Sequence, residues 1–520
     1  MPSTLKPEAR MEGPLSRRDF LKLAGALSLS MAAPGLGTSY RGFQSLNAGQ
    51  NVIILVFDAL SANHIGLHGY ARDTMPNLSR WAERAVVYHN HYAGGNFTTP
   101  GTASILTGTM PWTHRALDLY GTIATPFVQK NIFSAFPDHY RLAYTHNPVA
   151  NTLLKQVSTQ MDEYVPLGTL LLTNDEVITT LFGRDESTAS VSWTRAMKSQ
   201  EEGYAYSLFM ARVVTALRER RIASLRSQFP VGLPHIAGDN YFLLEDAIDW
   251  LGEKVQSVPE PFMGYFHFMP PHGPYTTRVD YFGHFAGDGY WPPYKRRDLF
   301  ADEEGNGFEQ LQRKRLSYDE FILYVDSEFG RLMDRLESSG LLANTWVVLT
   351  SDHGEMFERG IAGHLTPVLY EPVIRVPLLI FEPGRTDRED IHANTSVVDL
   401  LPTLLQVTGQ EQAAWSEGGV LPPFSNSYES RESVYVLQAR KSGAGEPLTE
   451  ATVAQIKGQH KLMYFFGYKQ LGSGDERLEL YDIESDPEEL NDLASSKRGT
   501  AAEMLEEIKS KLTEVNRPYL

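Results

Sequence analysis

Four short stretches of this chain are almost continuously apolar, and they limit its possible folds more than any other feature. They cover residues 51–57, 262–268, 346–350 and 376–381, and most of their side chains are aliphatic or aromatic. Such stretches are typical of strands that are buried on both faces of a parallel sheet. Residues 311–338 carry apolar side chains at intervals of three and four, which predicts a long amphipathic helix. The chain therefore predicts an α/β fold in which helices flank a large central sheet.

Acidic residues stand where two of these strands end. Asp58 follows the first strand directly, and Asp352 and His353 follow the third. Ligands of open α/β sheets bind beyond the carboxyl ends of the strands, so both positions are candidate sites. Asp58 alone is explained equally well as the cap of the next element. An adjacent acid and imidazole are costly to bury unpaired, and a bound metal is the simplest arrangement that satisfies both.

A short helix with hydroxyl groups at its beginning is predicted over residues 96–108. Thr98 and Thr99 precede Pro100, which can occupy the first helical position, and Gly108 can end the helix. The N-terminus of such a helix attracts anions, although a threonine that merely caps a surface helix gives the same pattern. Together with the two acidic strand ends, the threonines form a set of oxygen and imidazole groups suited to a divalent cation.

Further polar residues follow two other strands. His146 and Asn147 come after a short strand predicted at residues 142–145, and His272 lies between prolines after residues 262–268. His146 and Asn147 are candidates for substrate contact, and the prolines on either side hold His272 rigidly in place. A turn before proline explains His146 and Asn147 equally well, and a loop histidine bonded to the backbone would explain His272.

The charge and composition exclude several classes of protein. The formal net charge of −17 argues against nucleic-acid binding through a basic surface. An anionic substrate would therefore be held locally, by a metal and a few side chains. The absence of cysteine excludes disulfides, thiolate metal sites and cysteine nucleophiles.

Two parts of the chain carry weaker patterns. Residues 155–240 are mixed and partly helical, and we interpret them as an insertion or lid. After residue 410 the sequence turns polar, before an apolar run at 461–466 and a helical pattern at 501–515. This change predicts a smaller C-terminal α+β subdomain over residues 411–520.

The N-terminus resembles a twin-arginine export signal. Arg17 and Arg18 precede Phe-Leu-Lys and an apolar run at residues 23–33, which is too short to cross a membrane. We expect residues 1–40 to be a signal peptide and linker read by the twin-arginine (Tat) export machinery, and the protein to be periplasmic or extracellular. A basic amphipathic arm that stays on the protein is the alternative. We expect no integral membrane segment after the signal.

The motifs and their order resemble the sulfatase family, within the wider alkaline-phosphatase-like superfamily. The resemblance covers residues 51–494. It implies an α/β sandwich with a mixed central sheet in a catalytic domain over residues 50–410, followed by a C-terminal subdomain with its own small sheet. The matching motifs are residues 51–58, 66–78, 98–108, 271–272, 351–355, 370–378 and 480–489.

The resemblance also implies roles for individual residues. Asp58, Asp352 and His353 match metal ligands of the family. Thr98 falls at the position of the nucleophile, which also contacts the metal. A last pair of residues, His272 and His364, matches basic residues that contact the ester and protonate the leaving group.

Four positions depart from the sulfatase pattern. Sulfatases convert a cysteine or serine at the nucleophile position to formylglycine, whose second hydroxyl lets a sulfated intermediate collapse. Thr98 cannot form this group. Gly101 and Thr102 replace the Ser-Arg of the sulfatase motif, and Ala59 replaces a second acid that many sulfatases carry.

The expected cofactor is therefore one divalent cation, without formylglycine. Because one acid is missing and His353 is present, manganese or zinc is favoured, with calcium or magnesium as alternatives. Whether His272 and His364 hold a second metal stays open.

These observations predict an exported, metal-dependent hydrolase that cleaves phosphate mono- or diesters through a phosphothreonine at Thr98. Similar proteins with threonine at this position include phosphodiesterases, phosphatases and phosphotransferases. The expected substrate is a small-molecule ester or one derived from a glycan or lipid. The alternatives are a sulfuric ester hydrolase without formylglycine, a phosphotransferase, and a binding protein that has lost its catalytic activity.

Overall fold

The computed structural model describes residues 49–172, 204–238, 240–301, 307–425, 433–472 and 475–520. The signal peptide predicted for residues 1–40 lies outside these residues. The chain divides into two units, and residues 45–171 and 226–520 form the one that contains all the strands named below. The other unit comprises residues 1–44 and 172–225, and its described part contains helix α10 (Tyr204–Leu225).

An eight-stranded sheet forms the centre of the larger unit. Its strands lie in the order β10-β2-β9-β6-β1-β5-β3-β4. β9 runs antiparallel to both of its neighbours, and the other pairs are parallel, so the sheet is mixed as predicted. The strands are β1 (Asn51–Phe57), β2 (Val86–Tyr92), β3 (Tyr140–Thr145), β4 (Glu163–Tyr164), β5 (Phe262–Phe268), β6 (Thr345–Thr350), β9 (Leu378–Phe381) and β10 (Glu389–Ser396).

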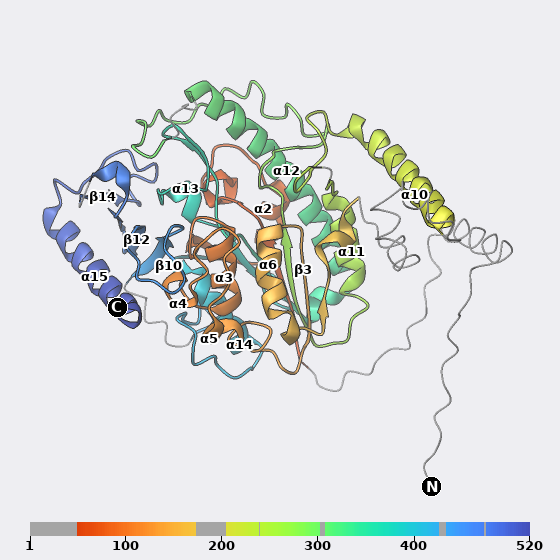
Figure 1. The fold of residues 1–520 in the computed structure, drawn as a ribbon, viewed down its shortest axis with the longest axis horizontal. Coiled ribbons are helices and arrows are strands. Elements are labelled where there is room, and N and C mark those ends of the chain that lie inside the picture. The colour runs from red at the N-terminus through yellow and green to blue at the C-terminus, as the bar shows by residue number, and fades with distance from the viewer. Residues whose placement is uncertain (1–48, 173–203, 239, 302–306, 426–432, 473–474) are drawn as a thin grey trace, which may run out of the picture. The chain divides into compact units, whose positions relative to one another are not determined.

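Helices flank this sheet in two groups (Figure 1). In the first group α3 contacts both α6 and α14. Apolar residues of these three helices share one core cluster with alternate residues of β1, among them Val52 and Ile54. α2, α11 and α12 pack together as the second group. The helices are α2 (Pro76–Ala82), α3 (Thr98–Thr107), α4 (Pro111–His114), α5 (Thr125–Val128), α6 (Pro148–Val157), α11 (Leu244–Lys254), α12 (Phe308–Ser338), α13 (Glu371–Ile374) and α14 (Leu400–Val407).

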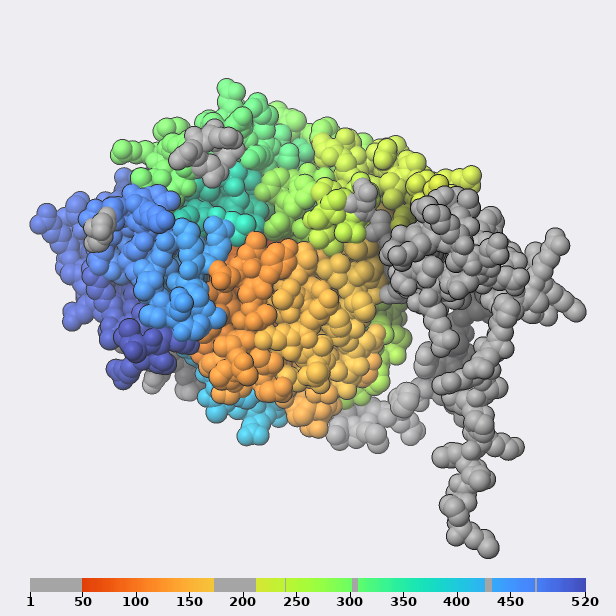
Figure 2. Space-filling model, in the orientation of Figure 1, coloured from red at the N-terminus to blue at the C-terminus, as the bar shows by residue number. Residues whose placement is uncertain are grey.

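A smaller antiparallel sheet forms the C-terminal part, as predicted. It consists of β11 (Val434–Gln438), β12 (Ala451–Lys457), β13 (His460–Phe466) and β14 (Glu476–Asp482), in that order, with helix α15 (Arg498–Asn516) beside it. The space-filling view shows residues of this part directly against residues that follow α3 (Figure 2), and Trp112 shares a core cluster with Leu437. Lys461 is fully buried between Glu371 and Glu489, 3.0 and 2.6 Å away, which joins β13 to α13. The C-terminal sheet is therefore packed onto the central one.

Several strands of the structure, among them β2, β4 and β10, were not predicted, and one predicted helix begins earlier. Residues 163–164 form β4, which pairs with β3 at the edge of the central sheet, so the insertion predicted from residue 155 begins after this strand. The helix predicted to begin at Pro100 begins at Thr98, which makes Thr98 its first residue. Within the described residues, none of the helices combines the length and apolarity that a bilayer crossing needs.

Candidate active site

The site lies where the carboxyl ends of four neighbouring strands meet. In the order β6-β1-β5-β3, the strands run parallel, so the residues that follow them emerge at one edge. Asp58 follows β1, and its backbone N–H donates a hydrogen bond to the carbonyl of Phe268 at the end of β5. Asp352 and His353 follow β6, and Asn147 follows β3. The strand order thus brings together residues that lie up to about 300 positions apart.

Asp58, Asp352 and His353 form a buried group that could hold a metal ion. One ligand atom from each lies within 4.8 Å of the others, and all three side chains are fully buried. His353 Nε2 lies 3.3 Å from Asp58 Oδ1 and 3.6 Å from Asp352 Oδ2. Asp58 Oδ1 accepts no hydrogen bond although it is buried, an arrangement that is costly unless a cation satisfies the oxygen. The donor set therefore fits a divalent cation.

The electrostatics of this group favour positive charge. Burial raises the pKa of Asp58, but the nearby histidines, His272 foremost, lower it well below its ordinary value. Burial opposes protonation of His353, yet Asp352 and Asp58 together raise the pKa of His353 to about 9. The carboxylates of Asp58 and Asp352 thus favour a positive charge at this point, as a cation site requires.

Thr98 lies beside this group at the N-terminus of α3. Its Oγ1 is 3.4 Å from His353 Nε2 and 3.3 Å from the side-chain amide nitrogen of Asn147. Gly101, one turn along the helix, lets α3 approach closely, because a Cβ at this position would lie 2.1 Å from the carbonyl oxygen of Asp352. Thr102 Oγ1 lies 3.4 Å from Asp352 Oδ2. The two replacements of the sulfatase Ser-Arg are therefore part of the contact between α3 and the acidic loop.

Asn147 holds two parts of the site together. Its side-chain oxygen accepts hydrogen bonds from the N–H groups of Val149 and Ala150, which caps α6. Its amide nitrogen donates to Asp58 Oδ2 and lies near Thr98. Asn147 was predicted to bind substrate. In the structure it contacts Asp58, a candidate metal ligand, and Thr98, the candidate nucleophile.

His364 and His272 lie next to the acidic group. The rings of His353 and His364 are 4.2 Å apart, and those of His364 and His272 are 5.0 Å apart. His364 Nδ1 contacts Glu355 Oε1 at 3.0 Å, and His272 Nδ1 donates to the carbonyl of Gly273 at 2.7 Å. Each ring therefore has its Nε2 available for another partner. Burial lowers the pKa of His364 below its ordinary value, although Glu355 acts in the opposite direction.

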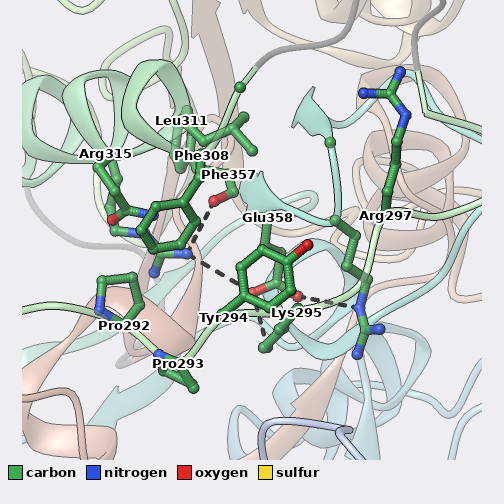
Figure 3. A pocket seen from close by; sticks show the side chains of 14 residues that line it. Pro292, Pro293, Tyr294, Lys295, Arg297, Phe308, Leu311, Arg315, Phe357 and Glu358 are labelled. Carbon is green, nitrogen blue, oxygen red and sulfur yellow. Dashed lines mark hydrogen bonds and ion pairs between the residues drawn. The ribbon is translucent and has the colours of Figure 1, made fainter.

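The hairpin of β7 (Met356–Glu358) and β8 (Ile361–Gly363) fixes the positions of Glu355 and His364, which flank it. Figure 3 shows its outer end, where Lys295 and Arg315 converge on Glu358 below the ring of Tyr294. Lys295 Nζ lies 2.8 Å from Glu358 Oε2. Since Lys295 and Glu358 are both buried, this ion pair anchors the hairpin firmly.

A cavity of about 450 Å³ opens beside His364. Its walls come from the segment around His364 and from the C-terminal part, which contributes Gln438, Arg440 and Lys441. Lys441 forms an ion pair with Glu450 at 2.8 Å. A space of this size next to the candidate catalytic histidines suits the non-reacting part of a small ester.

Sequence reasoning missed two residues of this site. His267 lies in β5, and its Nε2 is 3.4 Å from Asp58 Oδ2 and 3.7 Å from Asp352 Oδ2. It was read only as part of a buried strand, and a single imidazole within an otherwise apolar strand was the available signal. Glu355 lies in the motif at residues 351–355, but the sequence indicates no role for it. Its contact with His364 forms only when the hairpin folds.

The comparisons with known proteins agree with this fold. Residues 50–410 match the sulfatase family model, and residues 366–518 match the model for the C-terminal region of N-sulphoglucosamine sulphohydrolase. The first match covers more than half of the chain, so the protein belongs to the sulfatase family and is a hydrolase of that family.

Two relatives and one solved structure are similar to this chain. The chain is 25% identical over 444 residues to choline-sulfatase of Rhizobium meliloti (strain 1021), covering 82% of this chain and 78% of the relative. It is 23% identical over 495 residues to the multifunctional alkaline phosphatase superfamily protein PehA of Trinickia caryophylli, covering 86% and 91%. The crystal structure of phosphonate monoester hydrolase of Agrobacterium radiobacter is similar in fold, with a TM-score of 0.63 at 19% identity, covering 91% of this chain and 96% of that one.

Proposed function

We propose that this protein hydrolyses phosphoesters in a metal-dependent reaction that passes through a phosphothreonine at Thr98. The observation that carries the proposal is the unmodified threonine hydroxyl, 3.4 Å from His353 Nε2 and beside the buried Asp58 and Asp352. A threonine cannot be converted to formylglycine, and a sulfated threonine would lack the second hydroxyl that allows collapse. Phosphorus esters suit this residue better, because water can release the phosphoryl group from a phosphothreonine by in-line attack.

The residues of the site have separate roles in the proposed reaction. Asp58, Thr98, Asp352 and His353 would hold the cation, with manganese or zinc favoured by the mixed oxygen and nitrogen donors. When bound, the cation lowers the pKa of the Thr98 hydroxyl and neutralises charge on the ester. The side-chain amide nitrogen of Asn147 donates to Asp58 Oδ2 and lies 3.3 Å from Thr98 Oγ1, so it keeps the Thr98 hydroxyl beside Asp58.

The chemical steps then follow from the positions of these groups. Thr98 Oγ1 gives its proton to solvent water and attacks the phosphorus, and the bond to the leaving alcohol breaks. His272 or His364, in its imidazolium form, gives the Nε2 proton to the departing oxygen. Water then attacks the phosphothreonine, which releases the phosphoryl product and restores the Thr98 hydroxyl.

Removal of the nucleophile tests the proposal. One purified preparation would be assayed with an aryl phosphate, a bis-aryl phosphate, an aryl phosphonate monoester and an aryl sulfate, with manganese or zinc and with a chelator. We expect metal-dependent turnover of at least one phosphorus ester, and a loss of roughly a thousandfold or more in Thr98→Ala. Thr98→Ser keeps the attacking oxygen and serves as the matched control.

Two outcomes would contradict the proposal. Full turnover by Thr98→Ala would exclude a phosphothreonine. Turnover of the aryl sulfate alone would favour the alternative of a sulfate ester hydrolase, which the similarity to choline-sulfatase supports.

A further inference from the structure

We infer that His267 is a further protein ligand of the cation site and takes the place of the acid that Ala59 lacks. This inference rests on the metal-dependent function proposed above. His267 is fully buried in β5, and its Nε2 has no hydrogen-bond partner. An unpartnered ring nitrogen beside two buried carboxylates is costly, and a shared cation would satisfy all three groups.

The distances within the group support this assignment. His267 Nε2 lies 3.4 Å from Asp58 Oδ2 and 3.7 Å from Asp352 Oδ2. His353 Nε2 lies at closely similar distances, 3.3 and 3.6 Å, from oxygens of the same two carboxylates. Ligand atoms around a tetrahedral zinc ion with bonds of about 2.0 to 2.1 Å are about 3.3 Å apart. Both imidazoles thus approach the same two acids, His353 at Oδ1 of Asp58 and His267 at Oδ2.

The other nitrogen of His267 has a partner that suits this role. His267 Nδ1 lies 3.5 Å from the hydroxyl of Tyr265, two residues earlier in the same strand. If the Nδ1 proton points to Tyr265, then Nε2 carries the lone pair that coordination requires. The parallel pairing of β1 with β5 sets Val56 opposite His267, so the ring emerges close to the point where Asp58 leaves β1.

Position 59 explains why an additional ligand is needed. Ala59 is fully buried between Asp58 and the loop that carries Asp352, and its N–H lies 3.4 Å from Asp352 Oδ1. Its methyl group cannot coordinate a cation. With His267 included, the site offers two carboxylates and two imidazoles, which suits zinc or manganese better than calcium, a cation that prefers six to eight oxygen ligands.

The affinity for metal ions tests the inference without recourse to turnover. The zinc dissociation constant of the full chain would be measured by competition with a chromophoric chelator, for the parent protein, His267→Gln and His91→Gln. His91 is a matched control, because it is also fully buried, has an unpartnered Nε2 and contacts a hydroxyl, that of Thr395, through Nδ1. We expect His267→Gln to bind zinc at least tenfold more weakly and His91→Gln to retain the parent affinity.

X-ray absorption spectroscopy of the zinc-loaded parent protein provides a test that no folding defect of a variant can obscure. Two coordinated imidazoles, His353 and His267, are expected. A single imidazole, or an unchanged affinity in a folded His267→Gln protein, would overturn the role of His267 alone. A parent protein that binds neither zinc nor manganese would instead overturn the metal-dependent function itself.

Discussion

Glu355 shows how a single charge can act on the reaction through another residue. It is buried, and its contact with His364 Nδ1 leaves Nε2 of that ring directed elsewhere. Burial raises the pKa of Glu355, but His364 foremost, together with His272 and His353, lowers it below its ordinary value. An ionised Glu355 therefore orients the ring of His364 and favours its imidazolium form, in which Nε2 carries the proton of the candidate acid.

We predict that Glu355→Gln slows the cleavage of esters with poor leaving groups more than that of esters with good ones. A weakly acidic alcohol needs a proton as it leaves, whereas a nitrophenolate does not. We expect a fall of about 10- to 100-fold in kcat for an alkyl ester, with KM and metal content little changed, measured by steady-state kinetics. Asp390→Asn, which removes the partner of His89 at 2.7 Å, is the control. An equal loss for both kinds of ester would argue for a general structural defect instead.

Helix α3 is the element on which the position of Thr98 depends. It begins at Thr98, and all of its residues are buried. Because Gly101 has no side chain, the first turn of the helix contacts the backbone of Asp352 directly. The nucleophile and one candidate ligand thus share a rigid contact.

We predict that Gly101→Ala lowers both turnover and metal affinity, because its Cβ would lie 2.1 Å from a backbone oxygen and must push α3 away from Asp352. We also expect a loss of about 1 to 3 kcal/mol in the free energy of unfolding, measured by urea denaturation. Gly499→Ala in α15 is the control, since no atom lies within 4 Å of its Cβ position. That variant should be as active as the parent and slightly more stable. Equal behaviour of the two variants would contradict the prediction.

At the scale of the whole molecule, buried neutral histidines make stability depend on pH. Burial lowers the pKa of His91, His114 and His146 to about 3 in each case. His114 accepts a hydrogen bond at Nδ1 from the N–H of Ala116, and its Nε2 contacts Ser104 Oγ at 3.1 Å, which joins α4 to α3. An imidazolium would break this arrangement.

The sign of the pH effect follows from these values. In the unfolded chain a histidine binds a proton below about pH 6.5, whereas the folded protein keeps these three neutral down to about pH 3. Between these limits the unfolded state binds more protons. The free energy of unfolding therefore falls as the pH is lowered, by about 1 kcal/mol per pH unit for each histidine.

We predict that His114→Gln weakens this dependence. Urea denaturation of the metal-free protein between pH 7 and 4.5 would measure the slope for the parent and the variant. The variant should be less stable at pH 7 but should lose about 1 kcal/mol less per pH unit on acidification. Parallel curves for the two proteins would mean that His114 is not the titrating group.

The local apolar pattern alone was sufficient to predict the buried strands. The predicted bounds of β1 and β5 agree with the structure, because a strand buried on both faces needs apolar side chains at every position. The edge strands were not predicted. Most residues of β10 are partly or fully exposed, and β4 has only two residues. Edge strands carry polar side chains on their solvent side, so their composition resembles that of loops.

The sequence by itself determined four groups of the site, Asp58, Asp352, His353 and Thr98, because they stand at the ends of recognisable elements. Only the tertiary structure decided which of these groups meet. The strand order and register turn His267 toward the same carboxylates, and the hairpin brings Glu355 to His364. Local periodicity reports burial along one element, whereas strand order depends on pairing between segments that are hundreds of residues apart.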